Sequence, residues 1–152
     1  MGCDIHFFAE YREDALSPWK FLPAPGSACD YRYGEGDPER PGYDGHSVDR
    51  RYLRDWFDER NYVLFGMLAG VRGDAEPVAE PRGWPADLCP ELEAERSDIE
   101  HTPCWLMVYE MQEHFARRPE HASADFETCL AEMVRVAGVG PENIRAVFYF
   151  DS

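Results

Sequence analysis

The chain of 152 residues is predicted to form a single domain, because it is long enough to bury a core and 44% of its residues are hydrophobic. Its 30 acidic and 15 basic residues give a formal net charge of -15, which argues against direct binding to nucleic acid or to an anionic membrane. No apolar run approaches the roughly 20 residues that span a bilayer, and no basic start precedes an apolar segment, so we predict no signal peptide and a cytoplasmic location. Five cysteines, an odd number without a C-x-x-C pair, argue against a zinc ribbon or a disulfide framework.

The first elements in chain order are two strands and a long loop. Apolar and polar residues alternate over residues 3–12, which predicts a strand with one face buried. Residues 17–22 are expected to form a short second strand in a hairpin. The segment near 23–46 holds four prolines and five glycines, so it is predicted to be a long loop within the single domain of residues 1–152.

Two helices and a second long loop are predicted next. Ser47 begins a stretch with apolar residues at helical spacing over 47–58, and Asn61 stands at the cap position of a second helix. The apolar stripe of that second helix contains Leu64, Phe65, Leu68 and Val71. The segment near 74–100 is acidic and rich in proline, and it is predicted to be the second loop.

The last part of the chain is predicted to contain two helices and a strand. Thr102 and Pro103 have the residue types of a cap and a first helical residue, which predicts a helix over 102–115. A final helix is predicted over 125–137 and a strand over 144–150. Because strands at both ends flank four helices, the pattern predicts an α+β domain. Its small, mostly antiparallel sheet is expected to include both terminal strands side by side, with about four helices packed on it.

Both ends of the chain carry a resemblance to a known family. The motif Cys3-Asp4-Ile5-His6 and the final Val147-Phe148-Tyr149-Phe150-Asp151 resemble an uncharacterised family of small proteins from bacteriophage genomes and from bacteria that carry prophages. Shorter stretches within 60–72, 81–87 and 101–106 are similar to that family as well. The chain departs from the family's pattern at Cys104, where serine is usual, and at Ser152, where asparagine is usual. The resemblance implies a phage-like accessory protein and brings no mechanism with it.

A metal site is the first chemical hypothesis. Asp4 and His6 are two positions apart on a predicted strand, so their side chains leave the same face about 6.5–7 Å apart. A carboxylate and an imidazole suit zinc, manganese or iron, so a divalent metal held by Asp4, His6 and His101 is predicted, with Asp151 nearby. The alternative is an ordinary solvent-facing side of an antiparallel sheet. Phe8 on that face argues that something covers it.

Arginine and cysteine supply two further hypotheses. Arg60 and Arg82 stand among turn and cap residues, where a planar guanidinium could hold a phosphate or a carboxylate. The alternative for each arginine is an ion pair with one of the many acidic residues. Cys104 would follow a predicted helix start, where the helix dipole lowers a thiol pKa and favours a nucleophile. The alternative for Cys104 is a buried thiol beside Trp105.

Taken together, these patterns predict a protein that binds a small anionic ligand or a nucleotide, together with a divalent metal where the metal site forms. The expected cleft lies between the polar face of the first strand, the last residues and the two loops. Its candidate residues are Asp4, His6, Glu10, Arg60, Arg82, His101 and Asp151. The alternative is a non-catalytic acidic protein that inhibits or binds a host protein by presenting carboxylates to a basic groove. No P-loop, G-x-G-x-x-G or G-x-S-x-G motif is present, so catalysis is left open.

Overall fold

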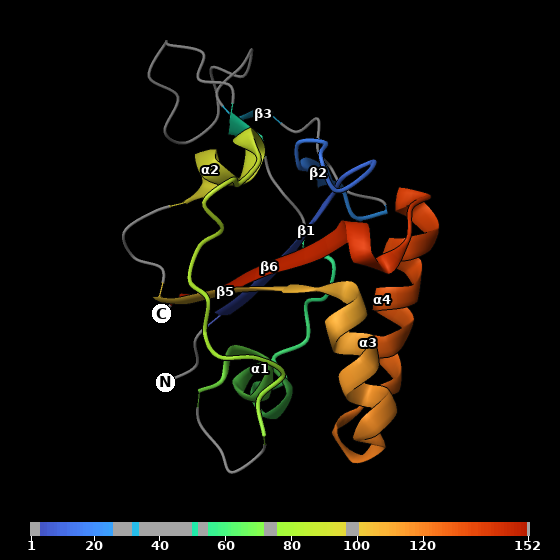
Figure 1. The fold of residues 1–152 in the computed structure, drawn as a ribbon. Helices are drawn as coiled ribbons and strands as arrows, with labels where there is room; N and C mark the ends of the chain where they lie inside the picture. Colours follow the sequence, from blue (N-terminus) through green and yellow to red (C-terminus); the bar gives the residue numbers. More distant parts are fainter. Residues whose placement is uncertain are drawn as a thin grey trace.

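The computed structural model describes residues 4–25, 32–33, 50–51, 55–71, 76–96 and 101–151. Its main sheet has four antiparallel strands in the order β2-β1-β6-β5 (Figure 1). These strands are β1 (Asp4–Tyr11), β2 (Lys20–Leu22), β5 (His101–Met107) and β6 (Ile144–Asp151). The α-helices in the described residues are α1 (Tyr62–Ala69), α2 (Pro90–Glu95), α3 (Val108–Arg117) and α4 (Ala124–Ala137). The predicted α+β class is therefore confirmed.

Smaller elements complete the described part of the chain. The 3-10 turns η1 (Pro119–His121) and η2 (Pro141–Asn143) follow α3 and α4, and β3 (Arg32–Tyr33) pairs with β4 (Arg50–Arg51). Apart from β3, most of the predicted loop near 23–46 lies outside the described residues. Among the described helices, none combines the length and the apolar character needed to cross a bilayer.

The two ends of the chain lie side by side at the centre of the sheet, as predicted. β1 and β6 pair over eight residues, from Asp4 opposite Asp151 to Tyr11 opposite Ile144. Figure 1 shows both strands crossing the middle of the molecule side by side. Because residues directly opposite each other in an antiparallel pair share a face, this register decides which side chains meet.

The first face of the sheet carries the main core. Phe7 of β1 and Phe148 of β6 are directly opposite each other, and their rings lie 6.0 Å apart. Helices α1, α3 and α4 cover this face and supply buried residues that include Phe65, Leu68, Met111, Phe115, Phe126, Leu130 and Met133. Phe126, Leu130 and Met133 of α4 are fully buried against this face.

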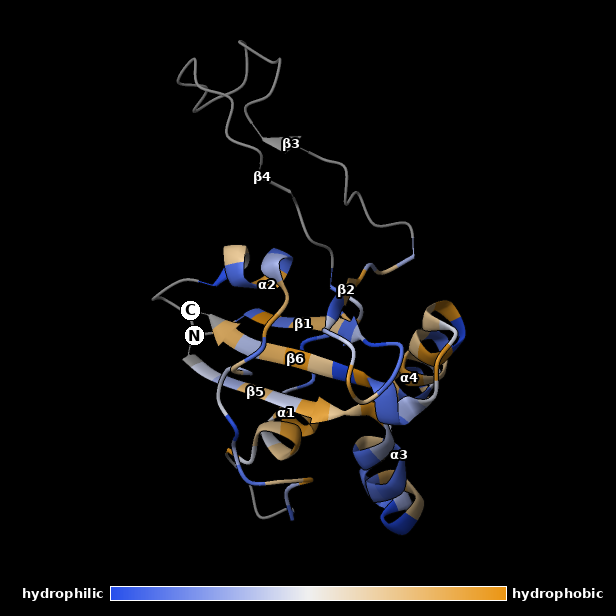
Figure 2. Ribbon diagram, turned by 45° about the horizontal axis from the view of Figure 1, so that its top comes forward, coloured by the Kyte–Doolittle hydropathy of each residue, from blue (hydrophilic) through white to orange (hydrophobic). Residues whose placement is uncertain are grey.

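The second face is also covered, as Phe8 suggested. Phe8, Val147 and Tyr149 form a second buried cluster with Cys89 and Leu92. Leu92 belongs to α2, and Figure 2 places α2 on the side of the sheet opposite α1 and α3. Of the polar residues on this face of β1, Glu10 is fully buried and His6 is partly buried, whereas Asp4 at the beginning of the strand is exposed.

The predicted helix over 47–58 is wrong within the described residues. Arg50–Arg51 is a short strand, and residues 55–60 contain no helix. Asp55 Oδ1 instead accepts a hydrogen bond from Phe7 N at 2.8 Å, and Trp56 N donates to Phe7 O at 2.9 Å. Because β2 pairs only with residues 9–11 of β1, the rest of that edge needs partners, and this segment supplies them. Ser47 lies outside the described residues.

The predicted helix start at Thr102 is also wrong. His101–Met107 forms β5, and the helix begins later, at Val108. Cys104 and Leu106 face the main core, and Trp105 faces the other side of the sheet. This alternation of buried side chains between the two faces is typical of a strand, and it decides the structure here despite the cap-like residues Thr102 and Pro103. Thr102 adopts a positive φ of 52°, and the register shifts between His101 and Cys104, so the cap-like residues form an irregularity in the strand.

Residues at the helix ends account for where α1 begins and ends and for where α4 ends. Asn61 Oδ1 accepts a hydrogen bond from Leu64 N at 3.0 Å, and Gly70 ends α1 in the left-handed region. Gly138 ends α4 in the same way. The predicted loop over 74–100 contains one element that was not expected, the six-residue α2, which begins at Pro90.

A pair of histidines, one on α3 and one on η1, predicts a pH effect on stability. His114 is only 2% exposed, its Nε2 lies 2.9 Å from His121 Nδ1, and the two rings stack. Burial and the neighbouring His121 lower the pKa of His114 below its ordinary value of 6.5. His114 therefore binds a proton more readily in the unfolded chain than in the folded protein. Its contribution to the free energy of unfolding is fully present above pH 6.5 and is lost as the pH falls below that value.

We expect urea unfolding to show a lower free energy of unfolding at pH 5.5 than at pH 7.5. The variant His114→Gln, which cannot bind a proton there, should lose less stability over the same interval than the wild type. Equal losses in the two proteins would show that His114 does not cause the dependence.

Candidate functional site

Most of the predicted site residues belong to one end of the sheet, where β1, β6 and β5 pair. Asp4 is exposed and forms an ion pair with Arg60, just before α1. Strand register places Asp151 opposite Asp4 and His101 opposite Phe150, so the backbones of these positions are close together. The side chains of His101 and Asp151 lie outside the described part of the structure.

His6 lies in an aromatic environment at the same end of the sheet. Its ring stacks 5.0 Å from Tyr149 and 6.3 Å from Phe8, and its Nδ1 lies 3.7 Å from Asp55 Oδ2. Among the described residues, no group of three histidine, cysteine or acidic side chains could hold a metal ion. The carboxylate of Asp4 is paired with Arg60. The described side chains therefore give no support to the predicted metal site, whose third member, His101, they do not include.

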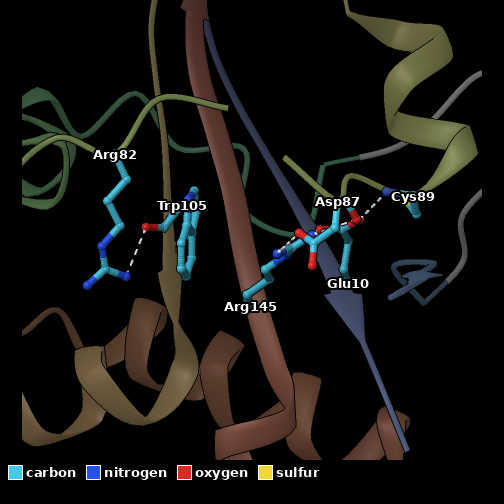
Figure 3. Close-up of polar contacts among 6 residues, drawn as sticks. All are labelled: Glu10, Arg82, Asp87, Cys89, Trp105 and Arg145. Carbon is cyan, nitrogen blue, oxygen red and sulfur yellow. Dashed lines mark hydrogen bonds and ion pairs between the residues drawn. The ribbon is translucent and has the colours of Figure 1, made fainter. Parts of the chain in front are cut away.

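Glu10 belongs to the opposite end of the strand, six residues or about 20 Å from Asp4. It is 0% exposed and directly opposite Arg145 of β6, whose Nε donates to Glu10 Oε1 at 2.6 Å. Glu10 Oε2 accepts a hydrogen bond from Cys89 N at 2.6 Å (Figure 3). Both carboxylate oxygens are thus used inside the protein, and Glu10 is not positioned to bind a ligand itself.

Arg145 connects this buried carboxylate to the layer that covers the sheet. It is 2% exposed, and its Nη1 donates to Asp87 Oδ1 at 2.8 Å while its Nη2 donates to Asp87 O at 3.2 Å. Burial would raise the pKa of Asp87, but the hydrogen bond and charge of Arg145 outweigh it and lower that pKa. The Glu10–Arg145–Asp87 network therefore fastens residues 87–89 onto the sheet.

Arg82 forms the bidentate ion pair that the sequence offered as its alternative role. Its Nη1 and Nη2 donate to the two carboxylate oxygens of Glu110 at 2.8 and 2.6 Å. Glu110 Oε2 also accepts from Met107 N at 2.8 Å, at the beginning of α3. Burial tends to raise the pKa of Glu110, but the hydrogen bonds from Arg82 and Met107 lower it. Arg82 thus fixes its own loop, which precedes α2, to α3.

Arginine and tryptophan side chains alternate across this end of the sheet, and we name the set the Arg–Trp ladder. Its members in spatial order are Arg12, Trp19, Arg145, Trp105 and Arg82. The guanidinium carbons of Arg12 and Arg145 lie 4.5 and 4.2 Å from the ring centre of Trp19. Those of Arg145 and Arg82 lie 5.7 and 4.5 Å from the ring centre of Trp105. Each contact is within cation–π distance, so five side chains from distant parts of the chain hold one another in place.

The Arg–Trp ladder lines an open cleft with a volume of about 930 Å³. Four carboxylates share the lining, from Asp14, Asp87, Glu110 and Glu142. Arg82 is the one predicted site residue among those that line this cleft, while Asp4, His6 and Arg60 lie at the other end of the sheet. The predicted residues are thus divided between two ends of β1.

The sequence reasoning missed Arg12, Trp19 and Arg145. One signal was present: β6 is apolar apart from Arg145 until its final aspartate, and β1 carries Glu10 near its far end. Opposite charges among the apolar residues of two neighbouring strands are the pattern expected for a buried cross-strand ion pair. The register that joins them was not predicted.

The cysteines do not form a nucleophilic site in the described residues. Cys104 is fully buried in β5, and burial raises the pKa of its thiol instead of lowering it. Burial raises the pKa of Cys129 to about 12. The nucleophile hypothesis for Cys104 loses its basis, because the helix start on which it depended is absent, and Cys104 is instead the buried thiol of the alternative interpretation. Cys3 lies outside the described residues.

Comparison of the chain with known protein families, with curated proteins and with solved structures finds no match. The fold and the site define an α+β domain with a four-stranded antiparallel sheet covered on both faces and an Arg–Trp cleft at one end. The resemblance to phage and prophage proteins stays an expectation from the terminal motifs.

Proposed function

We propose that this protein binds a small ligand in the Arg–Trp cleft through an anionic group of the ligand, a carboxylate or a phosphate. The observation that carries the proposal is the gathering of three guanidinium groups and two indole rings on one open cleft of a very acidic protein. Planar guanidinium groups match the geometry of carboxylates and phosphates, and indole rings supply contact area for a flat apolar part.

Arg12 is the arginine best placed to meet the ligand. Arg82 is occupied by Glu110, and Arg145 is occupied by Glu10 and Asp87. Arg12 is half-buried, and its Nε donates to the neutral side-chain amide of Asn143 at 3.1 Å. Among the described residues, no carboxylate lies within ion-pair distance of Arg12. Its two terminal nitrogens can therefore form the bidentate contact that the other two arginines already make within the protein.

The cleft is pre-organised for such a contact. Arg12 N donates to Asn143 O at 2.9 Å, so the end of β1 is fixed to η2 next to the guanidinium. Trp19 holds the guanidinium plane of Arg12 from one side. A binding group that is already ordered loses little conformational entropy when a ligand arrives, which favours affinity from a small contact.

Replacing Arg12 by glutamine tests the proposal, with 5′-AMP and 3-phenylpropionate as phosphate and carboxylate probes in isothermal titration calorimetry. We expect at least one probe to bind the wild type, and we expect about tenfold or greater weakening in the variant, because a charge-assisted hydrogen bond contributes about 1.5–3 kcal/mol. The control is Arg135→Gln, which removes an exposed arginine paired with Glu132 on α4. Binding that is equal in the wild type and in Arg12→Gln, or no binding of either probe at millimolar concentration, would contradict the proposal.

The same experiment bears on the alternative class, an acidic interaction protein. That class is favoured by the net charge of -15. It predicts that Arg12→Gln leaves all function intact and that association with a basic protein weakens steeply as salt rises. If the cleft binds its ligand through Arg12, the variant Arg12→Gln should instead lose function.

A further inference from the structure

We infer that the ligand of the Arg–Trp cleft is a zwitterion of the amino-acid class, whose carboxylate binds Arg12 and whose ammonium group binds Glu142. This inference rests on the proposed function, because it identifies the chemical class of the ligand for the same cleft. It follows from which charges on the cleft already have partners and which do not.

Most charges on the cleft are matched within the protein. Arg82 pairs with Glu110, and Arg145 pairs with Glu10 and Asp87. Asp14 is used by its own turn, where Oδ1 accepts hydrogen bonds from Leu16 N at 2.8 Å and from Ser17 Oγ at 3.0 Å. Two lining residues of opposite charge, Arg12 and Glu142, then have no ion-pair partner among the described residues.

Arg12 and Glu142 are held near each other without meeting. The backbone of Arg12 is hydrogen-bonded to Asn143, the residue next to Glu142, at 2.9 Å. Both residues line the cleft, yet they form no ion pair with each other, so their charged atoms are more than 4.0 Å apart. The carboxylate of Glu142 folds back over Gly140, in the space that a Cβ there would fill. An opposite pair held apart in this way matches a ligand that carries both charges.

The overall electrostatics also favour a zwitterion over a simple anion. The four lining carboxylates outnumber the three lining guanidinium groups, and Glu10 beneath them adds another negative charge. A ligand with a net negative charge would approach a protein of charge -15 against repulsion. An amino acid has no net charge near neutral pH, so it avoids this repulsion and still presents a carboxylate to Arg12.

Three probes that differ by one group each test the inference by calorimetry at pH 7.4 and 0.15 M salt. L-phenylalanine carries both charges, 3-phenylpropionate lacks the ammonium group, and 2-phenylethylamine lacks the carboxylate. We expect L-phenylalanine to bind at least tenfold more tightly than either of the others. Glu142→Gln should abolish its advantage over 3-phenylpropionate without weakening 3-phenylpropionate, whereas the exposed control Glu113→Gln on α3 should change neither.

The outcomes separate this inference from the proposed function. If 3-phenylpropionate binds in an Arg12-dependent way but L-phenylalanine binds no more tightly, the cleft takes anions and the zwitterion inference is wrong. The inference is equally wrong if Glu142→Gln keeps the full preference for L-phenylalanine. If no carboxylate-bearing probe binds, the inference and the carboxylate form of the proposed function fail together.

Discussion

Replacing Glu10 by alanine is expected to lower the free energy of unfolding by about 3–5 kcal/mol, the usual cost of removing one partner of a buried ion pair. Glu10 and Arg145 are both almost completely inaccessible to solvent, and they are directly opposite each other in the central strands. The substitution would leave the guanidinium with Asp87 alone and would also leave Cys89 N without its acceptor. Urea unfolding at pH 7.5 measures the loss.

The exposed Glu13, which pairs with Lys20 at 3.1 Å, offers the matched control, because Glu13→Ala should change stability by no more than about 0.5 kcal/mol. The double variant Glu10→Leu with Arg145→Met should recover most of the lost stability, since an apolar pair of similar volume often replaces a buried ion pair without cost. It should not recover ligand binding, because the centre of the Arg–Trp ladder is gone. A loss below about 1 kcal/mol in Glu10→Ala would contradict the structural role given to the pair.

Replacing Phe126 by alanine is expected to cost about 3–5 kcal/mol, because it empties the centre of the aromatic core. Phe126 is fully buried, and its ring lies 5.2 to 6.1 Å from four other aromatic rings. Those rings belong to Phe7, Phe57, Phe65 and Phe115. Since they come from β1, α1, α3 and the segment before α1, one cavity would weaken the contact of α4 with every layer it touches.

Val136, on the same helix and 39% exposed, provides the comparison for Phe126. Val136→Ala should change the unfolding free energy by less than about 0.5 kcal/mol, because a surface position loses little buried area. Thermal unfolding followed by circular dichroism should show the Phe126 variant melting well below the wild type. Similar melting temperatures for the two variants would show that α4 is not anchored through this ring.

The elements that the sequence predicted correctly are those with complete local signals. Asn61 and Gly70 mark the two ends of α1, and Gly138 marks the end of α4. Each of these residues acts on the backbone within a few positions of itself, so its effect is independent of the rest of the fold. The period of two over residues 3–12 predicted β1 for the same reason.

The elements that the sequence predicted wrongly are those where a distant strand edge competed with a local signal. Residues 101–107 have cap-like residues but complete the edge of β6, and residues 55–56 bond to the free edge of β1. A hydrogen-bond partner supplied from far along the chain outweighs a helix start whose first turn is costly to form.

The candidate site shows the same contrast between what local sequence predicts and what distant contacts decide. Composition and alternation by themselves determined an acidic α+β domain with both terminal strands in its sheet and a covered polar face on β1. Only the tertiary structure decided that Glu10 meets Arg145, 135 residues away, and that Arg12, Trp19, Trp105 and Arg82 gather around them. Alternation tells which face of a strand a side chain occupies, but strand register and the packing of the covering loop set its neighbours. Those depend on the whole core, so they cannot be read from any local stretch of residues.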